Sequence, residues 1–302
     1  MSKVDLHIHS EFSDDGELPV SRILDMCKST GMKLIAITDH NSVKSVNDVK
    51  EIIGTGKNGE TRVIPGVELD CFYRDINFHL LGYGIDHTRK EFAEIDADIR
   101  NQEKEAGEKR IILFQKATGI PLDAAAILNA ANGGIVTGEL IGQHLLAKEN
   151  AADYDVLKPY LPGGVKSDMP FVRIYWDFFA PEKPGYVHVH YIPLQEAIKL
   201  IHSSQGIAVV AHPGQTIAGD YTLLNDVIAE GIDGLEVYSS YHSAGDAERF
   251  LDITRQNKLL ATSGSDFHGK TKPNIRFGGH GAMLDDDELI RSFNLKLGQL
   301  SV

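Results

Sequence analysis

Seven short apolar segments, each next to histidine or acidic residues, constrain the fold of this chain more than any other feature. They are residues 4–8, 34–37, 63–67, 78–81, 207–211, 234–235 and 259–262. Most are uninterrupted apolar runs, a pattern typical of strands that are buried on both faces in a parallel sheet or barrel. The carboxyl ends of parallel strands meet at one edge, where α/β proteins assemble their sites. We therefore expect the polar residues that follow these runs to form a single site.

Helical patterns lie between the apolar segments. Apolar residues recur at helical spacing over residues 20–27, after Pro19 and before Gly31, and again over 194–201, after Pro193 and before Gly206. A third candidate helix covers residues 245–256. This alternation of strands and helices predicts an α/β domain with a barrel-like, parallel sheet.

The first apolar segment alternates with polar residues in a pattern that suits metal binding. Asp5, His7 and His9 would project from one face of a strand, because successive side chains point to opposite faces. Two imidazoles one residue apart can fill two positions around one divalent ion. The alternative is an edge strand that carries two surface histidines.

Composition limits the class of protein. The chain of 302 residues is long enough for one large domain, or for a domain with an insertion. No apolar stretch approaches the roughly 20 residues that cross a bilayer, and the first ten residues do not resemble a signal peptide, so we expect a cytoplasmic protein without a membrane partner. The net charge of −13 disfavours duplex nucleic acid as a partner but permits a small phosphorylated substrate.

Together, the polar motifs carry a family resemblance. They are His7-x-His9-Ser10, Ser13-Asp14, Thr38-Asp39-His40, Gly66-Val67-Glu68, His79-Leu80-Leu81-Gly82, Ala211-His212-Pro213 and Gly264-Ser265-Asp266-Phe267-His268. In this order they resemble the PHP superfamily, named for polymerase and histidinol phosphatase. The resemblance implies a distorted (β/α)7 barrel over residues 1–90 and 190–302, with a small, mainly helical insertion over 91–189. It also implies hydrolysis of phosphate esters with two or three divalent ions, Zn, Mn or Fe.

The resemblance implies a role for each polar residue. His7, His9, Glu68 and Asp266 would hold the first ion, and Glu68 would bridge to a second ion held by His79 and His212. Asp14, His40 and His268 would hold a third. The spacing from His9 favours Asp14, although Asp15 stays open because the usual Ser-Asp-Gly reads Ser13-Asp14-Asp15-Gly16 here. Asp5 and Asp39 would accept hydrogen bonds from ligating imidazoles.

The insertion should select the substrate. We expect helices near residues 92–99, 124–131 and 140–148, a solvated charged helical face over 103–110, and a loop at 161–164. The segment resembles that of nucleoside 3′,5′-bisphosphate phosphatases, but Gly138–Leu140 replaces an expected Arg-x-His pair and Gln215 an expected arginine. Two arginine side chains that would bind phosphate are therefore missing. We expect the substrate to be a phosphorylated compound other than a 3′,5′-bisphosphonucleotide. His242 remains as a catalytic or phosphate-binding candidate, and Arg173, Lys183, His188 and His190 are candidate replacements.

Metal-assisted hydrolysis is the expected mechanism. A hydroxide bridging the first two ions would attack phosphorus, and either the third ion with its water or His242 would assist the leaving group. A cyclic phosphodiesterase or an oligonucleotide exonuclease could use the same site. Two rival classes are a non-catalytic, metal-stabilised PHP domain and a metallohydrolase that cleaves C–N bonds. The sequence does not identify the oligomeric state.

Overall fold

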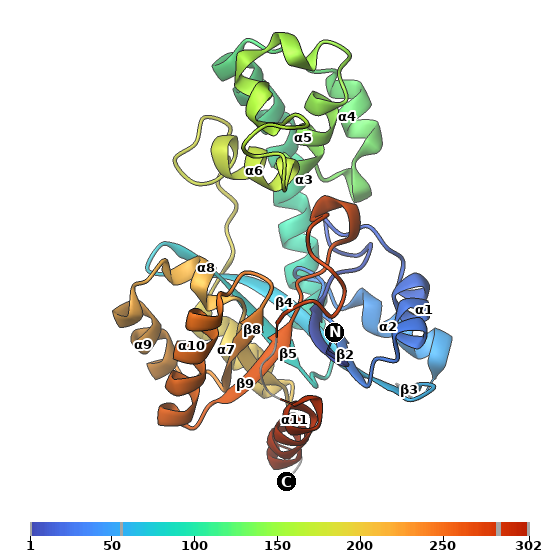
Figure 1. The fold of residues 1–302 in the computed structure, drawn as a ribbon, viewed down its shortest axis with the longest axis vertical. Helices are drawn as coiled ribbons and strands as arrows, with labels where there is room; N and C mark the ends of the chain where they lie inside the picture. The colour runs from blue at the N-terminus through green and yellow to red at the C-terminus, as the bar shows by residue number, and fades with distance from the viewer. Residues whose placement is uncertain (1, 55–56, 282–284, 301–302) are drawn as a thin grey trace.

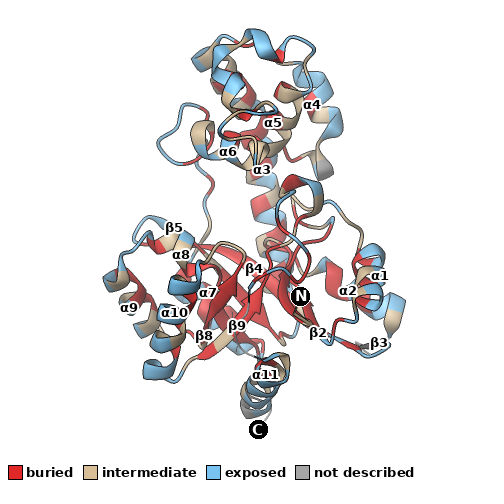
Figure 2. Ribbon diagram, in the orientation of Figure 1, coloured by how far each residue is buried: buried red, intermediate tan, exposed pale blue. Residues whose placement is uncertain are grey.

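A single twisted sheet forms the centre of the computed structural model, which describes residues 2–54, 57–281 and 285–300 (Figure 1). Its main path runs β1-β2-β4-β5-β7-β8-β9, with β3 and β6 each paired to β4. The strands are β1 (Val4–Ile8), β2 (Leu34–Ile37), β3 (Lys57–Asn58), β4 (Thr61–Tyr73), β5 (Ile76–Tyr83), β6 (Ile192–Pro193), β7 (Ile207–Val210), β8 (Gly234–Ser239) and β9 (Leu260–Gly264). All seven expected apolar segments are strands of the main path, and they form the buried centre of Figure 2.

The two ends of this path meet, which makes the sheet a nearly closed barrel. Just beyond β9, the backbone N–H of Asp266 donates to the carbonyl of His7 at 2.8 Å. One residue further, the N–H of His9 donates to the carbonyl of Phe267 at 2.9 Å. These bonds join β1 to the segment after β9 and place the His-x-His strand beside the last polar motif. The expected distorted α/β barrel is confirmed.

One strand of the main path differs from the expected parallel arrangement, and the short β3 is also antiparallel to β4. β5 is antiparallel to both β4 and β7, because β4 and β5 form a hairpin. Arg74 and Asp75 make its two-residue turn with φ of 51° and 63°, the left-handed values that such tight hairpins require. The reversal brings His79, near the beginning of β5, opposite Asp70 near the end of β4. His79 therefore reaches the same region as residues that follow parallel strands.

Helices cover the outside of the barrel. The three helices expected there are α1 (Val20–Thr30), α7 (Leu194–Ser203) and α10 (Ala244–Asn257). The others are α2 (Lys44–Ile53), α8 (Pro213–Ile217), α9 (Tyr221–Ala229) and α11 (Asp286–Leu300). Within the described ranges, no helix combines the length and the apolar character that crossing a bilayer requires.

The segment between β5 and β6 is mainly helical and has an apolar cluster of its own, away from the barrel (Figure 1). Its α-helices are α3 (Lys90–Thr118), α4 (Ala124–Ala130), α5 (Gly138–Leu146) and α6 (Pro170–Phe178). The long helix α3 connects the two parts, because Phe92 packs in the barrel core and Phe114 in the cluster of the insertion. The 161–164 loop is present. Three short 3₁₀ segments, Asn132–Gly134, Ala151–Asp153 and Asp155–Tyr160, complete the insertion.

The charged run at residues 103–110 is only partly the solvated face that the sequence suggests. Glu103 is buried and forms an ion pair with Arg110. Arg110 also donates to the carbonyl of Val136 at 3.1 Å. These two residues depart from the expected solvated face because their charges neutralise each other inside the insertion, while the other charged residues of the run are exposed.

Candidate metal centre

Histidine and carboxylate side chains from five strands or strand ends converge at one end of the barrel. Three overlapping groups of residues can be distinguished, and within each group the ligand atoms lie within 4.8 Å of one another. They are His7, His9, Glu68 and Asp266; His40, Glu68 and His79; and His9, Asp15, His40 and His268. The closure of the barrel between β1 and the segment after β9 brings together residues as far apart in the chain as His7 and Asp266.

Glu68 belongs to both of the first two groups. Its Oε2 is 3.1 Å from Nε2 of both His7 and His9. Its Oε1 is 3.0 Å from Nδ1 of His79 and 3.5 Å from Nε2 of His212. The two oxygens of one fully buried carboxylate thus face two sets of imidazoles, which is the arrangement of a carboxylate that can bridge two cations.

The rings of His7 and His9 are oriented by partners that the sequence did not identify for this role. Nδ1 of His7 lies 3.0 Å from Oε1 of Glu236, and Nδ1 of His9 lies 2.8 Å from Oγ of Ser13. Each contact occupies the nitrogen that faces away from the cluster and leaves Nε2 toward Glu68. Such outer partners fix the tautomer of a ligating histidine.

Asp5 and Asp39 have other roles than the expected direct contact with imidazole. Asp5 accepts from the backbone and side chain of Ser265 and from the backbone N–H of Gly278. Asp39 accepts from the backbone N–H and hydroxyl of Ser10 and from the hydroxyl of Ser13. The prediction was wrong because both carboxylates bind the loops that follow β1 and β9, and Asp39 is linked to the ring of His9 through the hydroxyl of Ser13.

Asp15, and not Asp14, lies in the third group. Oδ1 of Asp15 is 3.2 Å from Nε2 of His268, while Asp14 is absent from the groups found among the described residues. Burial, followed by the charges of Asp15 and Glu103, raises the pKa of Asp14 to about 8. Sequence spacing alone could not separate two adjacent aspartates, since the loop between Ser10 and Gly16 decides which one faces His268.

Two further carboxylates join the site. Glu236 was visible in the sequence only as the residue that ends an apolar run, and its Oε2 also accepts the backbone N–H of His212 at 2.8 Å. Asp70 was missed. Its Oδ1 lies 3.0 Å from Nε2 of His79, and its Oδ2 accepts from the Asn41 side chain at 2.6 Å. The signal for Asp70 was available, because it stands two residues after Glu68 on the same face of β4.

Backbone conformation at the site is unusual in three places. Asn41, His212 and Asp266 have φ of 54°, 25° and 59°, values that side chains other than glycine seldom adopt. Each follows closely on a strand and lies within or directly after a motif of the site. Such strained residues cluster where function requires a particular side-chain direction.

Several buried nitrogens of the cluster make no well-directed hydrogen bond, although three of them lie within 3.4 Å of a carboxylate oxygen, and this fits a metal centre. Within the part of the chain that the structure describes, they are Nε2 of His9, Nδ1 of His40, Nδ1 of His212 and Nε2 of His268. A buried polar atom without a partner is energetically costly and therefore rare, unless a bound ion or water serves as its partner. The mixture of imidazole and carboxylate donors suits transition metals better than Mg²⁺ or Ca²⁺.

The pKa values of the cluster reflect opposite charges in close contact. Burial alone would lower the pKa of His9, but the carboxylates of Asp266 and Glu68 outweigh it and raise that pKa to about 9. Burial alone would raise the pKa of Glu68, but His7, His40 and His79 hold it well below its usual value. The pKa values of His7 and His79 are raised in the same way, so in the metal-free cluster these rings and His9 carry protons that a bound ion would replace.

The candidate substrate residues lie in different settings. Nδ1 of His242 is 2.9 Å from the carbonyl of Val237, and its Nε2 accepts the backbone N–H of Gly214 at 3.1 Å. Both ring nitrogens therefore have backbone partners. Arg173 is exposed and pairs with Asp168 at 3.1 Å, and Lys183 is exposed in the loop after α6. Their contact with substrate stays a prediction.

His188 and His190 lie together on the surface. Nε2 of His188 is 3.1 Å from Nδ1 of His190, and Tyr186 and Gln102 contact the pair. The two rings thus contact each other rather than the cluster. Their proposed contact with phosphate also stays a prediction.

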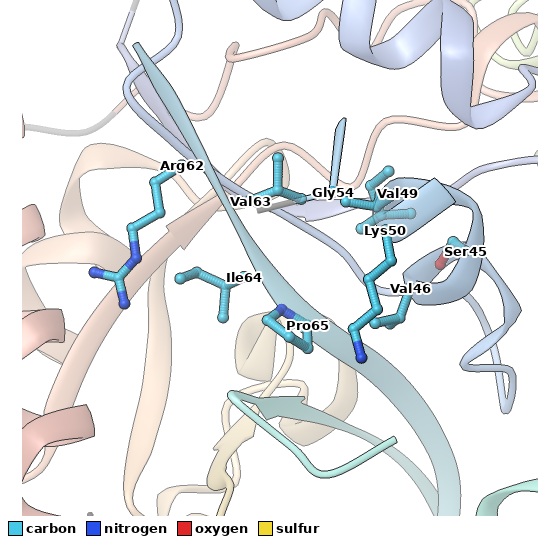
Figure 3. A pocket seen from close by; sticks show the side chains of 10 residues that line it. Ser45, Val46, Val49, Lys50, Gly54, Arg62, Val63, Ile64 and Pro65 are labelled. Carbon is cyan, nitrogen blue, oxygen red and sulfur yellow. The ribbon is translucent and has the colours of Figure 1, made fainter. Parts of the chain in front are cut away.

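A separate cavity of about 370 Å³ lies between α2 and β4 (Figure 3). Most of its lining is aliphatic, with Lys50 and Arg62 as the charged residues. No residue of the cluster lines it. The cavity is therefore distinct from the candidate metal centre.

Comparison with known proteins gives the context of this site. Residues 5–160 match the PHP domain family. The chain is 29% identical over 271 residues to a 3′,5′-nucleoside bisphosphate phosphatase from Chromobacterium violaceum, covering 89% of this chain and 88% of the relative. It is 30% identical over 280 residues to the 5′-3′ exoribonuclease Rnm of Escherichia coli, covering 87% and 84%.

A solved structure has the same overall architecture. It is described as an amidohydrolase from Chromobacterium violaceum with bound sulfate and no metal, and it matches with a TM-score of 0.76 and 25% identity over 96% of this chain and 97% of that chain. The matched family region holds the motifs of β1, β2, β4 and β5, and the fold brings them to the motifs of β7 and β9. The chain belongs to the PHP domain family.

Proposed function

We propose that this chain hydrolyses the phosphate ester of a small phosphorylated metabolite or nucleotide at the cluster around Glu68. The chain is a metal-dependent phosphoester hydrolase. The observation that carries the proposal is the position of Glu68, whose two oxygens face separate sets of imidazoles.

The residues present would hold two or three divalent ions. His7, His9, Glu68 and Asp266 would bind the first, and Glu68, His79 and His212 the second, with His40 close to Glu68 at 3.4 Å. His40, His268 and Asp15, in place of Asp14, would bind the third. The donor set favours Zn, Mn or Fe. Bound ions would supply the acidified water and the positive charge that phosphate ester hydrolysis requires.

The protein's own contribution is orientation. Glu236 and Ser13 hold the rings of His7 and His9 with Nε2 toward Glu68. Glu236 also fixes the backbone of His212. Because these partners are buried and rigid, the ligand atoms are arranged before any ion or substrate arrives, which reduces reorganisation during the reaction.

The insertion would select the substrate. It contacts the loops of the site directly: Arg100 on α3 donates to the carbonyl of Phe12 at 2.8 Å, and the carbonyl of Asp168 accepts from Asn274 at 2.7 Å. Glu139 on α5 lies close enough for the charge of Asp15, after burial, to raise its pKa, which reaches about 8. A carboxyl group with this pKa is largely protonated at neutral pH, so it can exchange hydrogen bonds with a substrate hydroxyl beside the phosphate but supplies no positive charge for a second phosphate.

Phosphate release by the purified protein tests the proposal. The protein is loaded with Mn²⁺ and assayed on sugar phosphates, nucleoside monophosphates, 3′,5′-bisphosphonucleotides and cyclic phosphates. The expected result is release from at least one small ester, abolished by a chelator and by His9→Ala in a folded protein. Ammonia release from amides without phosphate release would favour a C–N hydrolase, and no turnover with full metal content would favour a non-catalytic domain.

A second candidate is exonuclease activity on short oligonucleotides. The similarity to an exoribonuclease favours it, while the net charge of −13 opposes a long polyanion. Short 3′-labelled RNA in the same assay separates the two. Stepwise release of mononucleotides at a higher kcat/KM than any monoester would establish the exonuclease.

A further inference from the structure

The backbone fixes the position of Asp266 before its carboxylate makes any contact. Asp266 follows β9, has φ of 59°, and donates its N–H to the carbonyl of His7 at 2.8 Å. This conformation directs its side chain into the cluster. Oδ1 lies 3.1 Å from Nε2 of His9 and 3.3 Å from Nε2 of His7.

The other oxygen of the same carboxylate has two partners of its own. Oδ2 of Asp266 accepts from the hydroxyl of Tyr241 at 2.5 Å and from the ammonium of Lys272 at 2.6 Å. Tyr241 follows β8, and Lys272 lies in the loop after β9. Three separate backbone positions thus determine where the two oxygens of one carboxylate point.

Lys272 differs in its partner from the other lysine and arginine residues that form ion pairs in the described part of the chain. Its side chain is 15% exposed and that of Asp266 is 2% exposed. Among the ion pairs of the described residues, the pair of Lys272 with Asp266 is the one that joins a lysine or arginine to a member of the three ligand groups. Burial of an ammonium is costly unless the charge is paired, so this contact differs from a surface ion pair.

The geometry gives Lys272 a specific effect on Asp266. The terminal torsion of an aspartate is broad, so an unrestrained carboxylate can rotate and offer either or both oxygens to a cation. Tyr241 and Lys272 occupy Oδ2 and leave Oδ1 as the oxygen that faces His7 and His9. A carboxylate held in this way binds through one oxygen.

We propose that Lys272 is a positioning residue that, with Tyr241, holds Asp266 with a single oxygen toward the cation site formed by His7, His9, Glu68 and Asp266. The inference rests on the proposed function of that group as a metal site. Lys272 would then contribute to the affinity for the ion without contacting the ion. Partners of ligating carboxylates typically change metal affinity by about 10- to 100-fold.

Metal affinity of variants tests this role without any assay of turnover. Lys272→Met removes the charge and keeps the length of the side chain. Lys270→Met is the matched control, because Lys270 is two residues away with its side chain 65% exposed and its ammonium 3.9 Å from Glu17. Competition with a chromophoric chelator for Mn²⁺ or Zn²⁺ should show about 10- to 100-fold weaker binding of one ion in Lys272→Met and unchanged binding in Lys270→Met.

A double-mutant cycle tests whether Lys272 acts through Asp266. If it does, adding Lys272→Met to Asp266→Asn causes no further loss of affinity. Tyr241→Phe, which removes only a hydroxyl, should weaken the same ion, and Lys272→Arg should restore most of the affinity. These two variants keep the test decisive if Lys272→Met does not fold.

Two results would overturn the inference. One is wild-type metal affinity in both Lys272→Met and Tyr241→Phe, with an increase in KM for a phosphate ester, since Lys272 would then contact substrate directly. The other is equal loss of affinity from Lys272→Met in the wild-type and Asp266→Asn backgrounds. Failure of the proposed function looks different, because the wild-type protein itself would then bind no ion or release no phosphate.

Discussion

Oε1 of Glu236 lies 3.0 Å from Nδ1 of His7, with both side chains fully buried. The same carboxylate accepts the backbone N–H of His212 through Oε2. One residue on β8 therefore orients a ring on β1 and a loop after β7. This relationship explains how side chains from distant strands keep a common direction without help from a bound ion.

The first prediction concerns this carboxylate. Glu236→Gln keeps an acceptor for His212 but turns an amide N–H₂ toward His7. The neutral ring must then carry its proton on Nε2, the nitrogen that faces Glu68. We expect metal affinity and activity to fall by about 10- to 100-fold. Metal titration and phosphate release measure this, with the exposed Glu248→Gln on α10 as control; equal behaviour of the two variants would contradict the orienting role.

The second prediction concerns the close approach of β9 to β1. A Cβ on Gly264 would lie 2.2 Å from Cβ of His7 and 2.5 Å from Oε1 of Glu236. Gly264→Ala must therefore move the His-x-His strand, and we expect it to cost about 1–3 kcal/mol of unfolding free energy and to reduce metal content. Urea denaturation measures the loss. Gly298→Ala, where nothing lies within 4 Å, should be neutral or stabilising; a comparable loss there would count against this account.

The third prediction separates two adjacent aspartates. Asp15→Asn should lower the affinity for an ion at His40 and His268, because Oδ1 of Asp15 is 3.2 Å from Nε2 of His268. Asp14→Asn is the matched control and should leave that affinity within a few-fold of wild type. Elemental analysis after dialysis compares their metal content. A greater loss in Asp14→Asn would restore the assignment that sequence spacing favoured.

The fourth prediction concerns pH. In the metal-free protein the pKa of His9 is raised to about 9, so the ring is protonated at pH 7 and must lose its proton to bind an ion. Metal binding at pH 7 should release protons, and affinity should increase as pH approaches about 9. Calorimetry in buffers with different ionisation enthalpies measures the release. A binding enthalpy independent of the buffer would contradict this protonation state.

The same raised pKa fixes the sign of a stability effect. A histidine whose pKa is higher in the folded state stabilises the metal-free protein fully below its unfolded pKa, about 6.5. That contribution is lost as pH increases through about 9. The metal-free protein should therefore lose stability between neutral pH and pH 9 while the metal-loaded protein does not, which denaturation at several pH values can show.

The sequence predicted the strands well because buried strands require uninterrupted apolar runs. It also predicted a shared site for a set of residues that the structure brings close together, although their binding of metal stays a prediction; they are His7, His9, Glu68, His79, His212 and Asp266. It could not predict that β5 is antiparallel. Apolar content is the same in either direction, and only the two-residue turn at Arg74 and Asp75 reverses the chain.

The features of the site that the sequence could not predict depend mainly on loop geometry. The choice between Asp14 and Asp15, and the contact of Lys272 with Asp266, depend on backbone turns that composition and periodicity do not encode. The buried pair of Glu103 and Arg110 was hidden for a different reason. A run of charged residues usually predicts a solvent-exposed face. Only the structure shows that Arg110, next to the carbonyl of Val136, forms a buried ion pair with Glu103.

The most direct test of the central claim is the number of ions bound per chain, measured together with phosphate release, in the wild type and in Glu68→Gln. Because both oxygens of Glu68 face imidazoles, the account predicts at least two ions in the wild type under saturating conditions. In the folded Glu68→Gln variant it predicts that more than one ion is lost and that phosphate release is abolished. Fewer than two ions in the wild type, or undiminished phosphate release from Glu68→Gln, would contradict it.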